Sequence, residues 1–261
     1  MPEANQQVAL VTGATSGIGL ETAAFLAQRG LSVYMCSRNG DAVAEIVRDL
    51  RDKGLEADGR ACDVTSPEDG SALVNACMER YGQIDVLVNN AGRPGGGATA
   101  DLTDELWYDV INTNLNSVFL VTKAVLNSSG MLDRGHGRII NIASTGGKQG
   151  VVHAAPYSAS KHGVVGFSKA LGLELARTGV TVNAVCPGFV ETPMAERVRE
   201  HYSGIWEVDE EEVHSRITSR VPMGRYVEPY EVAEMVGYLI GDGAAAVTAQ
   251  ALNVCGGLGN Y

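Results

Sequence analysis

Positive charge is scarce in this sequence. It has 20 Lys and Arg residues against 31 Asp and Glu residues, which gives a formal net charge of −11 at pH 7. Binding to nucleic acid or to an anionic membrane surface requires a basic face, so the composition argues against both kinds of partner. A ligand that carries phosphate would have to be bound by individual cations, and Arg38 and Lys161 are the candidates.

Long apolar runs and metal-binding spacings are also missing. No apolar stretch approaches the roughly 18 residues of a membrane span, and the N-terminal region has no signal-peptide core, so we expect a cytoplasmic protein. His153 and His162 lack the spacing of a metal site and are interpreted as packing or hydrogen-bonding residues. The cysteines form no C-x-x-C pair, which predicts no metal site and reduced, buried thiols at Cys36, Cys62, Cys77, Cys186 and Cys255.

Strand-like apolar runs alternate with helix-like segments along the whole chain. This pattern predicts a single α/β domain over residues 1–261, with a Rossmann-like, doubly wound parallel sheet of about seven strands and helices on both faces. In such a sheet, ligands bind at the carboxyl ends of the strands. The expected strands are Gln7–Thr12, Leu31–Ser37, Ala57–Val64, Ile84–Asn89, Gly137–Ser144, Val180–Cys186 and Ala251–Val254.

A glycine-rich turn joins the first strand directly to an amphipathic helix, Leu20 to Arg29. Gly13 permits the tight turn, Gly17 lets the backbone approach a pyrophosphate, and Gly19 lets the helix pack on the strand. We therefore expect this turn to bind the phosphates of a dinucleotide. The expected contacts are Gly13, Thr15, Ser16, Gly17, Ile18 and Gly19.

Arg38 follows the second expected strand, where dinucleotide-binding folds contact the adenosine ribose. An acidic residue at this place binds the ribose hydroxyls, whereas an arginine accommodates a 2′-phosphate. The sequence therefore favours NADPH (or NADP+) over NADH, which in turn favours reduction as the direction in the cell.

Tyr157 and Lys161 lie four residues apart in the segment Tyr157-Ser158-Ala159-Ser160-Lys161, so on a helix they project from one face. An adjacent ammonium group lowers the pKa of tyrosine, ordinarily about 10, and suits it to act as a general acid. Ser144, at the end of an expected strand, can hydrogen-bond a substrate carbonyl, so the three residues suit ketone reduction. Tyr-x-x-x-Lys alone is also common on ordinary amphipathic helices.

Asn114 lies inside a long helical stretch, Asp104 to Leu126, where asparagine has a poor helix propensity. If its side chain faces the crevice, it can hold a water molecule that passes protons to Lys161 and on to Tyr157. The alternative is an ordinary irregularity of the helix.

Together these motifs resemble the short-chain dehydrogenase/reductases over essentially the whole chain. The motifs are Thr12-Gly13-x-x-x-Gly17-x-Gly19, Asn89-Asn90-Ala91-Gly92, Asn114, Ser144, Tyr157-x-x-x-Lys161 and Pro187-Gly188. The resemblance implies hydride transfer from a nicotinamide to a ketone carbon, and usually a homotetramer built from long paired helices. It implies that Tyr157 is the general acid, Ser144 orients the carbonyl, Lys161 binds the nicotinamide ribose and lowers the tyrosine pKa, and Asn114 holds the relay water. Further cofactor contacts are expected from Asp63, Val64, Asn90, Ala91, Gly92, Pro187, Gly188, Val190 and Thr192.

A finer resemblance is to the ketoreductases of bacterial aromatic (type II) polyketide synthases. It rests on Arg93–Gly97, on Ser144–Tyr157 and on the Gly256–Tyr261 segment. It implies reduction of one carbonyl, typically at the ninth carbon, of a poly-β-ketone attached to an acyl carrier protein. The glycines of Pro94–Gly97 are interpreted as leaving room for a bulky substrate, with a flexible loop as the alternative. The expected substrate contacts are Pro94, Gly95, Gly96, Thr145, Gln149, Val151, Met194, Tyr202 and Trp206.

The segment from about 193 to 225 departs from the regular alternation. It is rich in charge yet carries Tyr202, Ile205 and Trp206, so we expect a mobile helical lid over the active site, with a purely structural helical excursion as the alternative. Docking of an acidic carrier protein needs a cationic patch, for which Arg38 and Arg93 are the candidates. Thr65 stands where the resemblance leads one to expect further positive charge.

Other functions remain open. A 3-oxoacyl-acyl-carrier-protein reductase of fatty-acid synthesis shares all the catalytic motifs but usually has a shorter, less aromatic lid. A sugar-nucleotide epimerase would need a different glycine spacing and a sizeable C-terminal substrate domain. A non-catalytic NADP-binding regulator on the same fold would have no need of Asn114, Ser144, Tyr157 and Lys161 together.

Overall fold

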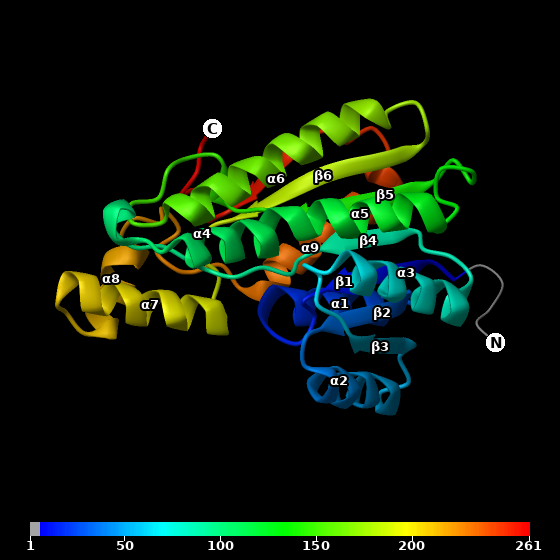
Figure 1. The fold of residues 1–261 in the computed structure, drawn as a ribbon, viewed down its shortest axis with the longest axis horizontal. Coiled ribbons are helices and arrows are strands. Elements are labelled where there is room, and N and C mark those ends of the chain that lie inside the picture. The colour runs from blue at the N-terminus through cyan, green and yellow to red at the C-terminus, as the bar shows by residue number, and fades with distance from the viewer. Residues whose placement is uncertain (1–5) are drawn as a thin grey trace.

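A computed structural model describes residues 6–261, and its centre is one parallel sheet (Figure 1). The strands follow the order β3-β2-β1-β4-β5-β6-β7, and every neighbouring pair is parallel. The predicted doubly wound α/β fold is therefore confirmed. The strands are β1 Val8–Thr12, β2 Ser32–Ser37, β3 Ala57–Ala61, β4 Val86–Asn89, β5 Gly137–Ile142, β6 Val180–Pro187 and β7 Ala251–Val254.

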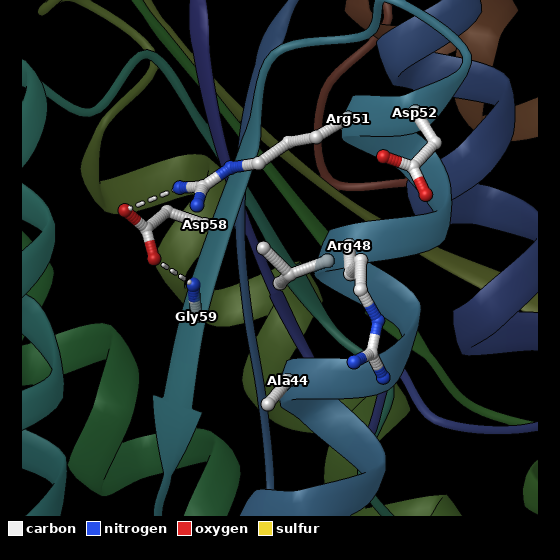
Figure 2. Close-up of a pocket in the computed structure, with 7 residues that line it drawn as sticks. Ala44, Arg48, Arg51, Asp52, Asp58 and Gly59 are labelled. Atoms are coloured by element: carbon white, nitrogen blue, oxygen red, sulfur yellow. Dashed lines mark hydrogen bonds and ion pairs between the residues drawn. The ribbon is translucent and has the colours of Figure 1, made fainter.

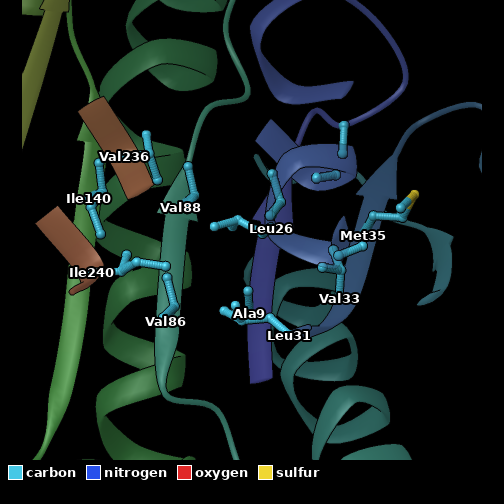
Figure 3. Close-up of a cluster of buried hydrophobic side chains, with 14 of the residues drawn as sticks. Ala9, Leu26, Leu31, Val33, Met35, Val86, Val88, Ile140, Val236 and Ile240 are labelled. Carbon is cyan, nitrogen blue, oxygen red and sulfur yellow. The ribbon is translucent and has the colours of Figure 1, made fainter. Parts of the chain in front are cut away.

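Alternate residues of the strands supply two separate cores, one on each face of the sheet. On one face Ala9, Val33 and Val86 pack with α1 Gly17–Gln28, α2 Gly40–Asp52 and α9 Pro229–Ile240 (Figure 3). On the other face Leu10, Tyr34 and Leu87 pack with α3 Pro67–Tyr81, α5 Ser117–Ser128 and α6 Ala155–Glu174. Because both faces are covered, the central strands are apolar throughout rather than alternating.

Several expected element boundaries move by a few residues. β3 ends at Ala61 rather than Val64, because Asp63 leaves the ladder and accepts hydrogen bonds from the backbone and hydroxyl of Thr65. β5 ends at Ile142 rather than Ser144, because Ser144 caps a short 3-10 turn, η3 Thr145–Gly147. The first helix begins at Gly17 rather than Leu20, and Gly19 lies in its first turn.

The long helix predicted around Asn114 is present, with an irregularity at the predicted place. α4 Asp104–Ile111 runs into a π-helical turn, η2 Asn112–Asn116, which continues as α5. A π-turn inserts an extra residue into a helix and is frequent at functional sites. Here it carries Asn114 on the inside of the molecule, where its side chain is fully buried.

The segment expected to form a lid is helical, with α7 Pro193–Trp206 and α8 Glu210–Thr218 set to one side of the main body (Figure 1). Ala195, Val213, Ile217 and Tyr226 form a small apolar cluster of their own there.

No helix of residues 6–261 combines the length and the apolar character that a membrane crossing requires. All five cysteines are buried and free, as the sequence predicts.

Candidate active site

Tyr157 and Lys161 lie one turn apart near the start of α6, as predicted. The Lys161 Nζ is 5.8 Å from the centroid of the Tyr157 ring. Ser144, at the carboxyl end of β5, accepts a hydrogen bond from the Gly146 backbone at 3.0 Å and also hydrogen-bonds Tyr157. A Cβ atom added to Gly146 would lie 3.4 Å from both Ser144 Oγ and the Tyr157 ring, so the glycine lets the three residues converge.

Burial dominates the acid–base properties of this pair. It lowers the pKa of Lys161 to about 8, and the ammonium donates one hydrogen bond, to the Ile142 carbonyl at 2.8 Å. Burial raises the pKa of Tyr157 above its ordinary value, and the hydrogen bond with Ser144 offsets only part of that effect. The sequence-based expectation of a lowered tyrosine pKa is therefore wrong for this structure. Tyr157 is a protonated phenol that can donate a proton.

Asn114 joins the loop after β4 to the start of α6. Its Oδ1 accepts from the Arg93 backbone at 2.8 Å, and its Nδ2 donates to the Arg93 carbonyl at 3.0 Å. The same Nδ2 lies 3.1 Å from Ser160 Oγ, which in turn donates to the Tyr157 carbonyl at 2.7 Å. Ser160 was missed by the sequence analysis, although its place beside Lys161 was a usable signal. The relay role of Asn114 stays a prediction.

The glycine turn forms a cradle that larger residues would fill. A Cβ on Gly19 would lie 2.3 Å from both the Gly13 carbonyl oxygen and Asn90 Nδ2, so this glycine permits close packing of helix and turn. Gly13 and Gly17 have φ values of +65° and +54°, which side chains disfavour. Ser16 caps α1 without a side-chain hydrogen bond, and the first turn has no acidic residue. The helix N-terminus is therefore well suited to an anionic phosphate.

Other predicted cofactor residues surround this cradle. Thr12, which the sequence analysis named in the glycine motif without a role of its own, accepts hydrogen bonds from the backbones of Asn90 and Ala91 at 3.0 and 3.1 Å. On the other side, Thr192 caps α7, and its methyl group would lie 3.0 Å from a Cβ on Gly17. The remaining predicted residues lie at the same carboxyl edge of the sheet, namely Asp63, Val64, Gly92, Pro187, Gly188 and Val190.

Arg38 is exposed just beyond β2 and has no ion-pair partner among residues 6–261. Hydrogen bonds from Thr65, and secondarily the charge of Arg38, lower the pKa of Asp63. Arg93, by contrast, forms an ion pair with Asp109 and donates to the Pro94 carbonyl. Of the two cations considered for carrier docking, only Arg38 is free of a neighbouring carboxylate partner.

The glycines of the Pro94–Gly97 loop pack closely on the side where a Cβ would project, whereas their expected contact with substrate stays a prediction. A Cβ on Gly95 would fall 2.3 Å from Val110 Cγ2, and one on Gly96 would fall 2.0 Å from the His153 carbonyl oxygen. The Gly97 backbone donates to that same carbonyl at 2.8 Å. These glycines therefore pack the loop against the chain that leads into α6.

Some of the expected substrate residues come together and others do not. Val151 lies beside the Ser144–Tyr157 pair, and the Tyr202 hydroxyl donates to the neighbouring Val152 carbonyl at 3.0 Å. Trp206 contacts Tyr202 with ring centroids 4.8 Å apart and packs on the apolar cluster of Ala195, Val213, Ile217 and Tyr226. Thr145 is buried within η3, whereas Pro94, Gln149 and Met194 are partly exposed at this edge.

A separate surface pocket lies between α2 and β3 (Figure 2). Arg51 and Asp58 form an ion pair of 2.9 Å across it. Strand β3 is at one edge of the sheet, and β2, β1 and β4 separate it from β5, which leads to Ser144. This pocket therefore does not belong to the catalytic arrangement.

Comparisons with known proteins agree with this geometry. The family model described as short chain dehydrogenase matches residues 7–203. A Streptomyces coelicolor protein described as a ketoacyl reductase is 72% identical over 261 residues, which cover both chains completely. Ketoacyl reductase 1 of the granaticin polyketide synthase of Streptomyces violaceoruber is 69% identical over 258 residues, 99% of this chain and 95% of that one. The crystal structure of F189W actinorhodin polyketide ketoreductase with NADPH superposes with a TM-score of 0.97 at 72% identity, covering 100% of both chains. The chain belongs to the short-chain dehydrogenase/reductase family.

Proposed function

We propose that the protein is an NADPH-dependent ketoreductase that reduces one carbonyl of a carrier-bound aromatic polyketide precursor to an alcohol. The observation that carries the proposal is the convergence of Ser144, Tyr157 and Lys161 beside the glycine cradle. One hydroxyl, one phenol and one ammonium group at the edge of a phosphate-binding turn suit hydride transfer coupled to protonation.

NADPH fits the residues that this structure brings together. The uncapped N-terminus of α1 and the cradle of Gly13, Gly17 and Gly19 would hold the pyrophosphate. Arg38 would bind the 2′-phosphate, since its guanidinium forms no ion pair among the described residues 6–261. When bound, the cofactor supplies the hydride that the side chains of the site cannot provide.

The catalytic side chains would divide the remaining work. Ser144 would hold the substrate carbonyl oxygen in hydrogen-bonding reach of Tyr157, whose phenol is protonated. Tyr157 then donates that proton to the developing alkoxide. The Lys161 ammonium, 5.8 Å from the centroid of the Tyr157 ring, would stabilise the phenolate that remains. Asn114 would hold the water through which the proton is replaced.

The substrate class is proposed from the relatives. Two of the proteins described above are named as polyketide ketoreductases, and identity to them extends over nearly the whole chain. We infer that this chain acts on a poly-β-ketone attached to an acyl carrier protein, typically at the ninth carbon, with Arg38 contributing to docking. We further propose that it works as a homotetramer in the cytoplasm, where its five buried thiols stay reduced.

The test is NADPH consumption with a rigid bicyclic ketone, trans-1-decalone, and with a short acetoacetyl thioester. The wild-type protein should prefer the bicyclic ketone, and Tyr157→Phe should abolish its reduction while NADPH binding is retained. Preference for the short thioester would move the assignment to fatty-acid-type reduction. Turnover of neither substrate would favour an NADP-binding regulator, and near-normal turnover by Tyr157→Phe would remove the proposed acid.

A further inference from the structure

Lys148 is a partly buried cation close to Ser144 that the mechanism above does not use. Its ammonium donates to the Ala251 carbonyl at 3.2 Å, to Asn253 Oδ1 at 3.0 Å and to the main-chain oxygen of Tyr261 at 2.8 Å. An ammonium group has three N–H donors, so all three are used here. The acceptors lie on β7 and on the segment that follows it, more than 100 residues away in the sequence.

The segment Cys255–Tyr261 is itself a built structure. The Asn253 amide, which accepts from Lys148, also donates to the Gly259 carbonyl at 2.9 Å. The Gly259 backbone donates to Cys255 Sγ at 3.3 Å, and the Met223 backbone donates to the Gly256 carbonyl at 3.0 Å. In Figure 1 this red segment lies beside the green loop that precedes α6.

The same segment also contacts η3 directly. The Tyr261 hydroxyl makes a long hydrogen bond, 3.4 Å, to the Thr145 carbonyl, and its ring centroid is 5.3 Å from Lys148 Nζ. Thr145 is the first residue of η3, Lys148 is its C-cap and Ser144 is its N-cap. Two residues of one short turn are thus tied to Tyr261.

The opposite side of η3 rests on the catalytic helix. A Cβ on Gly147 would lie 2.5 Å from the Lys161 carbonyl oxygen, so the turn packs directly on the backbone of α6 at Lys161. η3 is therefore enclosed between α6 on one side and the β7–Tyr261 segment on the other. Its position sets how far Ser144 stands from Tyr157.

We propose that Lys148 and Tyr261 are positioning residues that hold η3 so that Ser144 meets the substrate carbonyl beside Tyr157. This inference rests on the proposed ketone reduction. Neither residue contacts the reacting atoms, and their effect passes through Ser144. We call the contacts of Lys148 and Tyr261 with η3 the clamp. The clamp sets the position of the substrate carbonyl, so its loss should lower kcat and leave the affinity for NADPH unchanged.

A double-mutant cycle with Ser144→Ala tests this path. In the wild-type background, Lys148→Met should lower kcat for trans-1-decalone roughly tenfold, because small displacements of a positioning group are costly. Tyr261→Phe should cause a smaller loss. In the Ser144→Ala background neither change should alter kcat by more than about twofold. Equal losses in both backgrounds would overturn the proposal, since they would show a general structural effect.

A measurement without turnover separates this inference from the proposed function. Amide hydrogen exchange of residues 144–149 should rise in Lys148→Met and stay unchanged in Lys53→Met, an exposed lysine after α2. Faster exchange in a protein that reduces neither ketone would support the clamp and contradict the proposed function. Unchanged exchange in Lys148→Met would overturn the clamp, whatever the activity.

Discussion

Lys161 shows at the scale of one residue how burial and function oppose each other. Its side chain is almost inaccessible, and its ammonium has one hydrogen bond where three are available. Burial removes the ammonium from water and replaces few of its hydrogen bonds, so the charged form of Lys161 is destabilised. The pKa of Lys161 is lowered for this reason. Gly92 leaves room beside the ammonium, because an added Cβ there would lie 3.6 Å from Lys161 Nζ. The site therefore gives up stability to keep a cation available for ligand.

The lowered pKa of Lys161 predicts how stability changes with pH. Between about pH 8 and the ordinary lysine pKa of 10.5, the unfolded chain binds the proton that the folded chain has lost. The contribution of Lys161 to the free energy of unfolding therefore rises with pH through this window, in total by roughly 3 kcal/mol. Below pH 8 both states are protonated and the contribution stays at its lowest.

Urea unfolding of the wild type and of Lys161→Met, at about pH 7.5 and about pH 9.5, measures this effect. The difference in unfolding free energy, wild type minus variant, should be more positive at the higher pH. Tyrosines and cysteines titrate in both proteins and so cancel in the difference. A difference that does not change with pH would contradict the lowered pKa.

Arg38 carries the prediction about cofactor choice. Arg38→Asp should weaken NADPH binding by roughly tenfold to a hundredfold, because it replaces a charge-assisted contact to the 2′-phosphate with repulsion. NADH lacks that phosphate and should bind with little change. Fluorescence titration of both cofactors provides the measurement, and Arg48→Asp on α2 is the matched exposed control. Equal weakening of both cofactors by Arg38→Asp would disprove the contact.

At the scale of elements, local signals predicted which elements form, and distant contacts decided how they pack. The strand pattern and the poor helix propensity of Asn114 were enough to place seven strands and an irregular turn in the long helix. The close packing of Gly96 was not predicted, because its neighbour His153 is 57 positions away in the sequence. For the same reason nothing in the local pattern indicated the bond between Lys148 and Tyr261.

The close packing of Gly96 predicts that this loop positions α6. In Gly96→Ala the added Cβ would lie 2.0 Å from the His153 carbonyl oxygen and 2.9 Å from Ala154 Cα, directly before α6. Overpacking of this kind typically costs 1–3 kcal/mol, so we expect about 2 kcal/mol of lost stability together with lower kcat.

A matched control is available on α3. A Cβ on Gly70 would make only an ordinary van der Waals contact, 3.9 Å from Val121 Cγ2, and alanine is favoured over glycine in a helix, so Gly70→Ala should raise stability by up to about 1 kcal/mol. Urea unfolding and initial rates with trans-1-decalone compare the two variants. Full activity and stability in Gly96→Ala would show that the loop is free to move and would support the open-space interpretation.

At the scale of the whole molecule, the net negative charge bears on carrier docking, and the exposed apolar side chains bear on assembly. A net charge of −11 repels an acidic carrier protein at long range, so docking depends on local cations such as Arg38. The largest exposed apolar side chains include Trp107 and Tyr108 on α4, Phe119 on α5 and Leu173 on α6. Contiguous apolar groups on neighbouring helices are typical of surfaces that other chains cover.

This distribution favours one interface of the proposed homotetramer on the α4–α5–α6 side of the sheet. Wild-type protein should sediment with four times the mass of one chain, because covering these side chains removes apolar surface from water. A charge placed there would remain unpaired on burial, so Phe119→Asp and Leu173→Asp should each yield smaller species. Ala44→Asp, at an exposed position of α2 beside the edge strand β3, is the control and should keep the wild-type mass. A wild-type protein that sediments as a single chain would contradict the tetramer, and full assembly of both aspartate variants would move the interface to another face.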